Sequence, residues 1–512
     1  MSFTPLKTET NDHGVESLYV EKCSTTNGTS DVVLIENGTT KEPSIVSVVS
    51  PAASSAIISV EDSLFYAGWR VVFASFIIHV MVLGTFYSQG VLYRAILADD
   101  SLGADRASGI IFGSSAVATQ LAMGVLVGWL TSRFSHRRVA LLGSIFFSGG
   151  LLAASLAVNL VWLTIFFASL VGVGASLTFQ PAVVIIPLWF SVRRGLASGI
   201  AVAGSGVGTL IMAQVFDAAI QAGGWRFALR VTAAFSAVLL TASSMALVKP
   251  GGPKIAMRCK CRKSGRDNVR LDDEREIVSP LPVPSSSPPI PHHHQQQHLQ
   301  QPTSWRALLA EPAILPIACV MAIYAMCLFT VYAHIVPAAL DVGLSEVAGA
   351  GAVSAMGIAG AAGRLLVGAF SDRVRNKARL IVVCLSSGGL AVLALGAATP
   401  SLLRARAEIL ATSPAAAAVG IVYTFSIVFG FFSGSIVSQM PPLVAQEVGL
   451  TALPIAMGIV YCAQAPFVIT GPPLAGALRA AANSYTTLWC IVGAFMSLSP
   501  LGLMLIPSSR GP

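Results

Sequence analysis

The stretch Trp189–Gly208, WFSVRRGLASGIAVAGSGVG, decides the fold of this chain. Its aromatic pair is followed by Arg193 and Arg194, and then by an apolar segment interrupted only by small residues. Basic and aromatic side chains favour the inner headgroup level, so the stretch predicts a cytoplasmic turn that enters a membrane helix. Small residues let a second helix pack backbone to backbone. The expected packing positions are Gly199, Gly204 and Gly208. An ordinary small-residue face is the alternative interpretation of the glycines alone.

Composition places the chain in a bilayer. Of its 512 residues, 54% are hydrophobic and only 11% are charged, against roughly 25% in soluble domains. The net charge of +8 resides mainly in short loops and one central segment, as the positive-inside bias requires, and does not indicate nucleic acid binding. Most of the eight cysteines lie in apolar runs, so we predict no disulfide framework. No basic and apolar leader opens the chain, so we expect no cleaved signal peptide.

Twelve apolar blocks are each long enough to cross a membrane as a helix of about 20 residues. Those of the first half are Trp69–Leu92, Ala107–Leu130, Val139–Val158, Val161–Ile186, Leu196–Ala218 and Trp225–Val248. Those of the second half are Ala313–Pro337, Val347–Phe370, Leu380–Ala398, Ala415–Met440, Leu453–Gly476 and Tyr485–Ile506. A polar insert between two sets of six spans is typical of paired halves with a substrate site between them. We therefore predict an all-α membrane protein with twelve transmembrane helices in two six-helix halves.

Polar segments flank and divide these halves. The predicted divisions are a disordered cytoplasmic tail (1–62), the N-terminal half (63–248), a disordered cytoplasmic loop (249–311), the C-terminal half (312–507) and a C-terminal tail (508–512). The first tail and the loop are too polar and too biased in composition to bury a core. The loop carries a basic run suited to anionic lipid. Its cysteines and histidines fit no closed zinc spacing, so we predict no metal site.

The placement of lysine and arginine gives an orientation. With the N-terminus inside, the breaks after the second, fourth and eighth spans and the central loop all put their basic residues on the cytoplasmic side. The opposite breaks carry basic residues that acidic ones partly offset. Both termini should therefore be cytoplasmic. We expect the plasma membrane rather than a vacuolar or other internal membrane.

One motif recurs at matching points of the two halves. It reads GWLTSRFSHRR from Gly128 and GAFSDRVRNK from Gly368. Both copies resemble the loop motif Gly-x-Leu-Ala-Asp-Arg-x-Gly-Arg-Arg of the major facilitator superfamily, which latches the inner gate there. The second copy keeps the acid as Asp372, whereas the first has Ser132, so a symmetric charge latch is not implied. The expected gating residues are Arg133, Arg137, Asp372, Arg373, Arg193 and Arg194. Solvated basic loops that serve only topology are the alternative.

The stretch Trp189–Gly208 resembles the signature of the monocarboxylate transporter family within that superfamily. The shared elements are the aromatic pair, the basic pair, Leu-Ala-x-Gly and Ala-Gly-Ser-x-Val-Gly. Gly172–Pro181 and Gly471–Gly476 resemble patterns in spans four and eleven of fungal monocarboxylate-like carriers. The resemblance covers about residues 65–507. It implies the major facilitator fold and carriage of a small solute.

Arg364 is the strongest single candidate for a functional residue. A charged side chain inside a span is costly unless it faces a cavity or a partner. The segment around Arg364 resembles span eight of the family, which implies that this arginine meets the substrate carboxylate. A guanidinium suits that task because it offers two parallel donors. A snorkelling side chain or a structural gate contact is the alternative.

Two departures separate the chain from proton-coupled members of the family. Their acidic residue one turn before the arginine is Gly360 here, and their first-span lysine corresponds to a position near Tyr87. Other polar residues at membrane depth are His79, Gln120, Gln180, Gln214, Asp217, Arg230, His334, Gln439 and Gln464. Some of them should line the cavity, because unpaired polar groups in lipid are costly. Histidine titrates near neutral pH, so His334 is the candidate proton site. The expected substrate-binding set is Arg364, Tyr87, Gln89, His334 and Gln180.

The predicted function is secondary active transport of a small organic solute, a monocarboxylate or similar organic anion, by alternating access. A proton is the candidate co-substrate, and the lipid bilayer is the other expected partner. The alternatives are efflux of a fungal secondary metabolite, uptake of a neutral vitamin-like solute, and a non-transporting receptor. The sequence has no Walker loop, Gly-x-Ser-x-Gly or HExxH motif, so we predict neither an enzyme nor an ATP-driven pump, and no cofactor.

Overall fold

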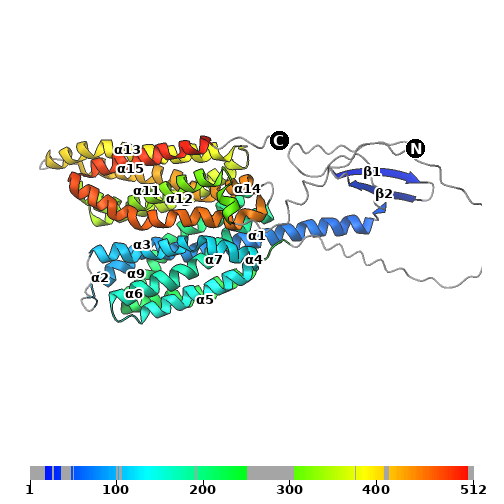
Figure 1. Ribbon diagram of the computed structural model, residues 1–512, viewed down its shortest axis with the longest axis horizontal. Coiled ribbons are helices and arrows are strands. Elements are labelled where there is room, and N and C mark those ends of the chain that lie inside the picture. The colour runs from blue at the N-terminus through cyan, green and yellow to red at the C-terminus, as the bar shows by residue number, and fades with distance from the viewer. Residues whose placement is uncertain are drawn as a thin grey trace, which may run out of the picture.

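The computed structural model consists mainly of long helices arranged in two groups (Figure 1). The described residues are 18–25, 28–35, 48–49, 51–99, 102, 106–190, 193–250, 305–374, 376–408 and 414–505. Most of the predicted loop 249–311 and all of the predicted tail 508–512 lie outside the described residues.

The first group holds the N-terminal half. Its elements are α1 (Pro51–Tyr87), α2 (Gln89–Leu97), α3 (Arg106–Ala122), α4 (Gly124–Arg133), α5 (His136–Ser155), α6 (Leu160–Phe166), the π-helix η2 (Phe167–Val171), α7 (Gly172–Val184), α8 (Ile186–Trp189) and α9 (Arg194–Ala246). α9 covers two spans, because the backbone leaves the helical conformation at Gly223 and Gly224. Gly224 has a φ of +80°, which glycine adopts without strain, so the chain can turn there.

The second group holds the C-terminal half. Its elements are α10 (Trp305–Leu309), α11 (Ile314–Asp341), α12 (Glu346–Ser371), α13 (Lys377–Glu408), α14 (Pro414–Ala482), α15 (Tyr485–Leu498) and the 3₁₀ helix η4 (Ser499–Leu505). α14 also covers two spans, divided at Gly449 with a φ of +79°. The described residues contain 10 helical runs long and apolar enough to cross a membrane. Because α9 and α14 each cross twice, the prediction of twelve spans in two halves is confirmed.

Regular structure also occurs in the segment 1–62, where the sequence predicted a disordered tail. β1 (Leu18–Thr25), β2 (Gly28–Ile35) and β3 (Val48–Val49) form an antiparallel sheet in the order β1-β2-β3, with Leu18 opposite Ile35. α1 begins at Pro51 and projects beyond the bundle (Figure 1). The β-branched run in β2 favours a strand, and proline suits a first helical turn. The prediction used the average polarity of the segment, which hid these short local patterns.

Large apolar side chains cover the outside of the bundle. Ile145 and Val238 are each 69% exposed, and Leu366 is 62% exposed. A soluble protein rarely exposes contiguous apolar patches of this kind. In a bilayer the hydrocarbon tails cover such a surface, while the helices satisfy their own backbone groups. The chain is therefore an integral, multi-pass membrane protein.

Glycines bring α1 and α9 close together within the first half. A Cβ at Gly204 would collide with the carbonyl of Phe76, and one at Gly208 would collide with the carbonyl of Val80. A Cβ at Gly84 would lie 2.7 Å from the carbonyl carbon of Gly208. Any larger residue at these positions would force the two helices apart.

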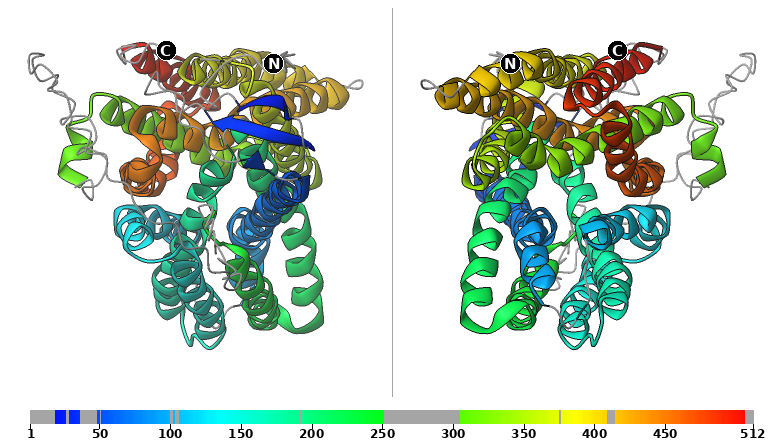
Figure 2. Two further views of the ribbon diagram at one scale, coloured as in Figure 1. Left: turned by 90° about the vertical axis from the view of Figure 1, so that its right-hand side faces the viewer. Right: turned by 90° about the vertical axis from the view of Figure 1, so that its left-hand side faces the viewer.

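The two halves contact each other along two seams. At the α9–α12 seam, a Cβ at Gly199 would collide with the carbonyl of Arg364. At the α4–α14 seam, a Cβ at Gly124 would lie 2.5 Å from the carbonyl of Gly458. Figure 2 shows the two groups of helices as separate layers that meet in the middle of the molecule. Small residues at both seams let the halves approach at backbone distance.

Candidate functional site

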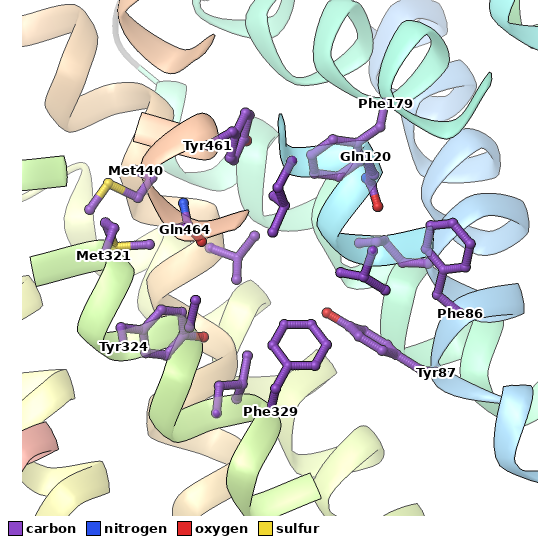
Figure 3. A pocket seen from close by; sticks show the side chains of 16 residues that line it. Phe86, Tyr87, Gln120, Phe179, Met321, Tyr324, Phe329, Met440, Tyr461 and Gln464 are labelled. Carbon is purple, nitrogen blue, oxygen red and sulfur yellow. The ribbon is translucent and has the colours of Figure 1, made fainter. Parts of the chain in front are cut away.

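A pocket lies between the two halves (Figure 3). The first half contributes Leu83, Phe86 and Tyr87 from α1, Val117, Gln120 and Leu121 from α3, and Phe179 from α7. The second half contributes Met321, Tyr324, Ala325, Leu328 and Phe329 from α11, and Val437, Met440, Tyr461 and Gln464 from α14. A pocket between paired halves is where a carrier of this architecture binds its substrate.

A few polar groups interrupt the apolar lining. Figure 3 shows Tyr87 and Gln120 reaching into the pocket from one half and Gln464 from the other. The Tyr324 hydroxyl donates to the Ser433 carbonyl at 2.7 Å, and the Gln464 amide donates to the Val460 carbonyl at 3.0 Å. Apolar walls with a few placed polar groups are typical of small-molecule sites.

Arg364 lies on α12 with only 6% of its surface exposed. A Cβ added at Gly360 would lie 3.2 Å from a terminal nitrogen of Arg364, so the missing side chain leaves room for the guanidinium. Among the described residues, its Nε has no hydrogen-bond partner. The charge of Arg364 acts on side chains from both halves: His79, Tyr87, Tyr324 and Tyr332. A buried cation without a full set of acceptors is ready to receive an anion.

Two tyrosines from opposite halves stack beside this site. The rings of Tyr87 and Tyr332 are 5.9 Å apart between centroids and inclined by 9°. Tyr87 also lines the pocket, so this ring contact lies next to its wall. The ring contact joins α1 of the first half to α11 of the second.

Asp372 joins the halves at the α9–α12 seam. One carboxylate oxygen accepts the Gly195 amide at 2.6 Å, and the other accepts the Leu196 amide at 3.0 Å. Both amides belong to the first turn of α9, whose N-terminus favours negative charge. Next to them, the Arg194 Nε donates to the Phe190 carbonyl at 2.7 Å, whereas the Arg193 side chain is exposed. Asp372 is therefore a cap supplied by the opposite half.

At the α4–α14 seam, a serine stands at the position that Asp372 occupies in the other copy of the motif. Ser132 donates to the carbonyl of Trp129 in its own helix at 2.8 Å and does not reach across. Instead, the Gln180 amide donates to the Pro454 carbonyl at 2.9 Å. A Cβ at Gly128 would collide with that same carbonyl. The two copies of the repeated motif thus make chemically different contacts.

The residues expected to bind substrate do not form one group. Tyr87 lines the pocket and Arg364 lies near it, but Gln89, Gln180 and His334 do not line it. Gln89 packs against Gly113 of α3, where an added Cβ would lie 2.7 Å from its amide nitrogen. His334 bonds through Nε2 to the Pro472 carbonyl at 3.0 Å. Of the remaining gating candidates, the side chains of Arg133, Arg137 and Arg373 are exposed.

Several pocket residues were not singled out by sequence reasoning. Gln120 and Gln464 belonged to the polar set at membrane depth, and their polarity was the available signal. Tyr324 and Tyr461 carried no such signal, because an aromatic residue in an apolar span is more often a packing residue. Their place in the pocket depends on which helices face each other across the halves.

Comparisons with known proteins show the family and the fold. Residues 75–426 match the family described as Major Facilitator Superfamily. The chain is 29% identical over 378 residues to Monocarboxylate transporter 12 of Mus musculus, covering 73% of this chain and 72% of the relative. It is 25% identical over 441 residues to Monocarboxylate transporter 13 of Rattus norvegicus, covering 86% and 89%.

Two solved structures share the fold. The human organic anion transporter MFSD10 (TETRAN) superposes with a TM-score of 0.60 at 13% identity, covering 85% of this chain and 99% of the other. The proton:xylose symporter XylE, bound to 6-bromo-6-deoxy-D-glucose, superposes with a TM-score of 0.58 at 14% identity, covering 87% and 96%. At such identities the likeness concerns the fold alone.

Proposed function

Since this chain belongs to the Major Facilitator Superfamily and is a transporter homologous to monocarboxylate transporters, we propose that it moves an organic monocarboxylate across the membrane by alternating access. The substrate carboxylate binds Arg364, between the two halves. The pocket beside it holds the rest of the substrate.

One observation carries the proposal. Arg364 is a guanidinium buried within the bundle, and no described residue accepts a hydrogen bond from its Nε. Burying a charge without a partner costs several kcal/mol, so a protein retains one there for a use. A carboxylate matches the guanidinium in charge and in its pair of acceptor oxygens.

Alternating access requires that the seams open and close. The cap from Asp372 to α9 and the contacts at the α4–α14 seam hold the halves together on the side of the repeated motifs. These are a few hydrogen bonds and glycine contacts, which can break and re-form as the halves rock. Uptake from the opposite side and release past these seams would complete the cycle.

The test is uptake of a radiolabelled monocarboxylate by proteoliposomes containing Arg364→Ala. We expect uptake to fall by about 10- to 100-fold, because a hydrogen bond to a charged group contributes about 1.5–3 kcal/mol. Arg364→Lys should recover only part of it, since a lysine lacks the two-pronged donor face.

The matched control is Arg230→Ala. Arg230 also lies in a span, but it bonds Ser155 within the first half, at 3.4 Å, and does not line the pocket. Uptake by this variant should stay within about twofold of the parent protein. Thermal unfolding in detergent checks that both variants fold. Unchanged uptake by a folded Arg364→Ala protein would refute the proposal.

A further inference from the structure

The pocket walls carry no side chain that is charged at neutral pH. Among the sixteen described residues that line it there is no Asp, Glu, Lys, Arg or His. Burying an unpaired charge against such walls would be costly. The part of the substrate that fills the pocket is therefore uncharged, and a second carboxylate or an ammonium group is excluded from it.

Rings and thioethers form much of the wall. Phe179 of the first half and Tyr461 of the second lie 5.7 Å apart between ring centroids, and Phe86 and Phe329 are further ring surfaces. Met321 and Met440 add flexible, polarisable side chains that adapt to a flat ligand. Aromatic groups pack well on such surfaces, beyond the gain from buried area alone.

Two neutral amides face this apolar space from opposite halves (Figure 3). Within the described part of the chain, Gln120 has no hydrogen-bond partner, and Gln464 uses only its Nε2. A primary amide both donates and accepts, so it suits a hydroxyl or keto oxygen. These amides would be costly to bury against a pure hydrocarbon.

We propose that the substrate is a bulky aromatic monocarboxylate with neutral oxygen substituents, rather than a short 2-oxo or 2-hydroxy acid. The inference rests on the proposed function, because it takes Arg364 as the partner of the carboxylate. The wall of sixteen residues presents six aromatic rings and two thioethers, a contact surface that suits a ring-bearing substrate. A three-carbon acid would leave most of the apolar wall without contact.

The test compares two acids that share one headgroup. Full-length protein in proteoliposomes is assayed for uptake of radiolabelled lactate and 3-phenyllactate, which differ only by the phenyl ring. We expect the apparent KM of phenyllactate to be at least about tenfold lower, as burial of a ring predicts. Equal values, or a preference for lactate, would overturn the inference and leave the proposed function standing. Uptake of neither acid, or only of the neutral phenyllactamide, would overturn the proposed function itself.

Variants tie the preference to the pocket. In Phe179→Ala the preference for phenyllactate over lactate should fall at least about threefold, since part of the ring contact is lost. The control is Phe235→Ala, because Phe235 is 52% exposed on the outside of the bundle.

In Gln464→Leu the preference for 4-hydroxyphenyllactate over phenyllactate should fall about 3- to 10-fold, as loss of one neutral hydrogen bond predicts. Unchanged ratios in both folded pocket variants would overturn the inference.

Discussion

His79 and His334 lie in different surroundings, although both are inside spans. The Nδ1 of His79 lies 2.7 Å from the Ser75 carbonyl, which can only accept, so Nδ1 carries the proton and Nε2 is left with a lone pair. His79 is fully buried, and no described residue bonds that Nε2. Its ring also meets Phe179, and Arg364 acts on it electrostatically. A second cation beside Arg364 becomes tolerable once an anion binds.

We therefore expect His79, rather than His334, to link anion binding to protons. In the parent protein the apparent KM for the carboxylate should fall as the pH is lowered from about 7.5 to about 5.5, because the bound anion favours the protonated histidine. His79→Gln should reduce this change to less than about twofold. His334→Gln is the matched control and should keep it, since the cation that acts on His334 is Arg479 and not Arg364. If His334→Gln removed the pH dependence and His79→Gln kept it, His334 would be the proton site instead.

Among the helices, α9 and α12 are held by a cap that crosses between the halves. Asp372→Asn removes the negative charge from the N-terminus of α9 and should loosen the α9–α12 seam. A helix cap contributes about 0.5–2 kcal/mol, so the open population should rise about 2- to 30-fold. The reporter is Ser371→Cys in a background without native cysteines, because Ser371 is buried at this seam. The rate of labelling by a soluble maleimide measures opening.

Glu346→Gln provides the control for this change, since Glu346 lies in the first turn at the other end of α12 and is exposed. It should leave the labelling rate unaltered. If Asp372→Asn labelled no faster than the parent, the cap would not hold the seam closed.

At the scale of the whole molecule, the even number of spans determines on which side of the membrane the two termini and each loop lie, and this can be measured. We expect tags placed before α1, within residues 249–304 and after η4 to lie on the same, cytoplasmic side, because an even number of crossings separates them. A tag in the break between α2 and α3 should lie on the other side. Each tag is a single cysteine, and the measurement is its labelling by an impermeant maleimide in sealed cells, which should reach only the tag between α2 and α3. A first tail and a central loop found on opposite faces would contradict the twelve-span arrangement.

Hydropathy and motif spacing predicted the span count and the pairing of halves, because bilayer thickness imposes a length on every helix. They did not predict the contacts that cross between halves. Asp372 was identified as a gate residue, but its partner Gly195 lies 177 residues away and gives no local signal. His334 and His79 are both polar residues in apolar runs, and only packing shows that Arg364 acts electrostatically on His79. Tyr324 and Tyr461 likewise line the pocket because of how the helices pack, which the sequence alone does not show.

The stacked pair of Tyr87 and Tyr332 has one more consequence. Once an external one-electron oxidant has taken a hydrogen atom from each phenol, two rings held nearly parallel at 5.9 Å are near enough to couple after a small adjustment, and the displaced ring hydrogens then return to the phenol oxygens. The carbon–carbon bond of the resulting dityrosine would tie α1 to α11 permanently. A transporter oxidised in this way would stay folded in the membrane, yet its two halves could no longer separate at that wall of the pocket.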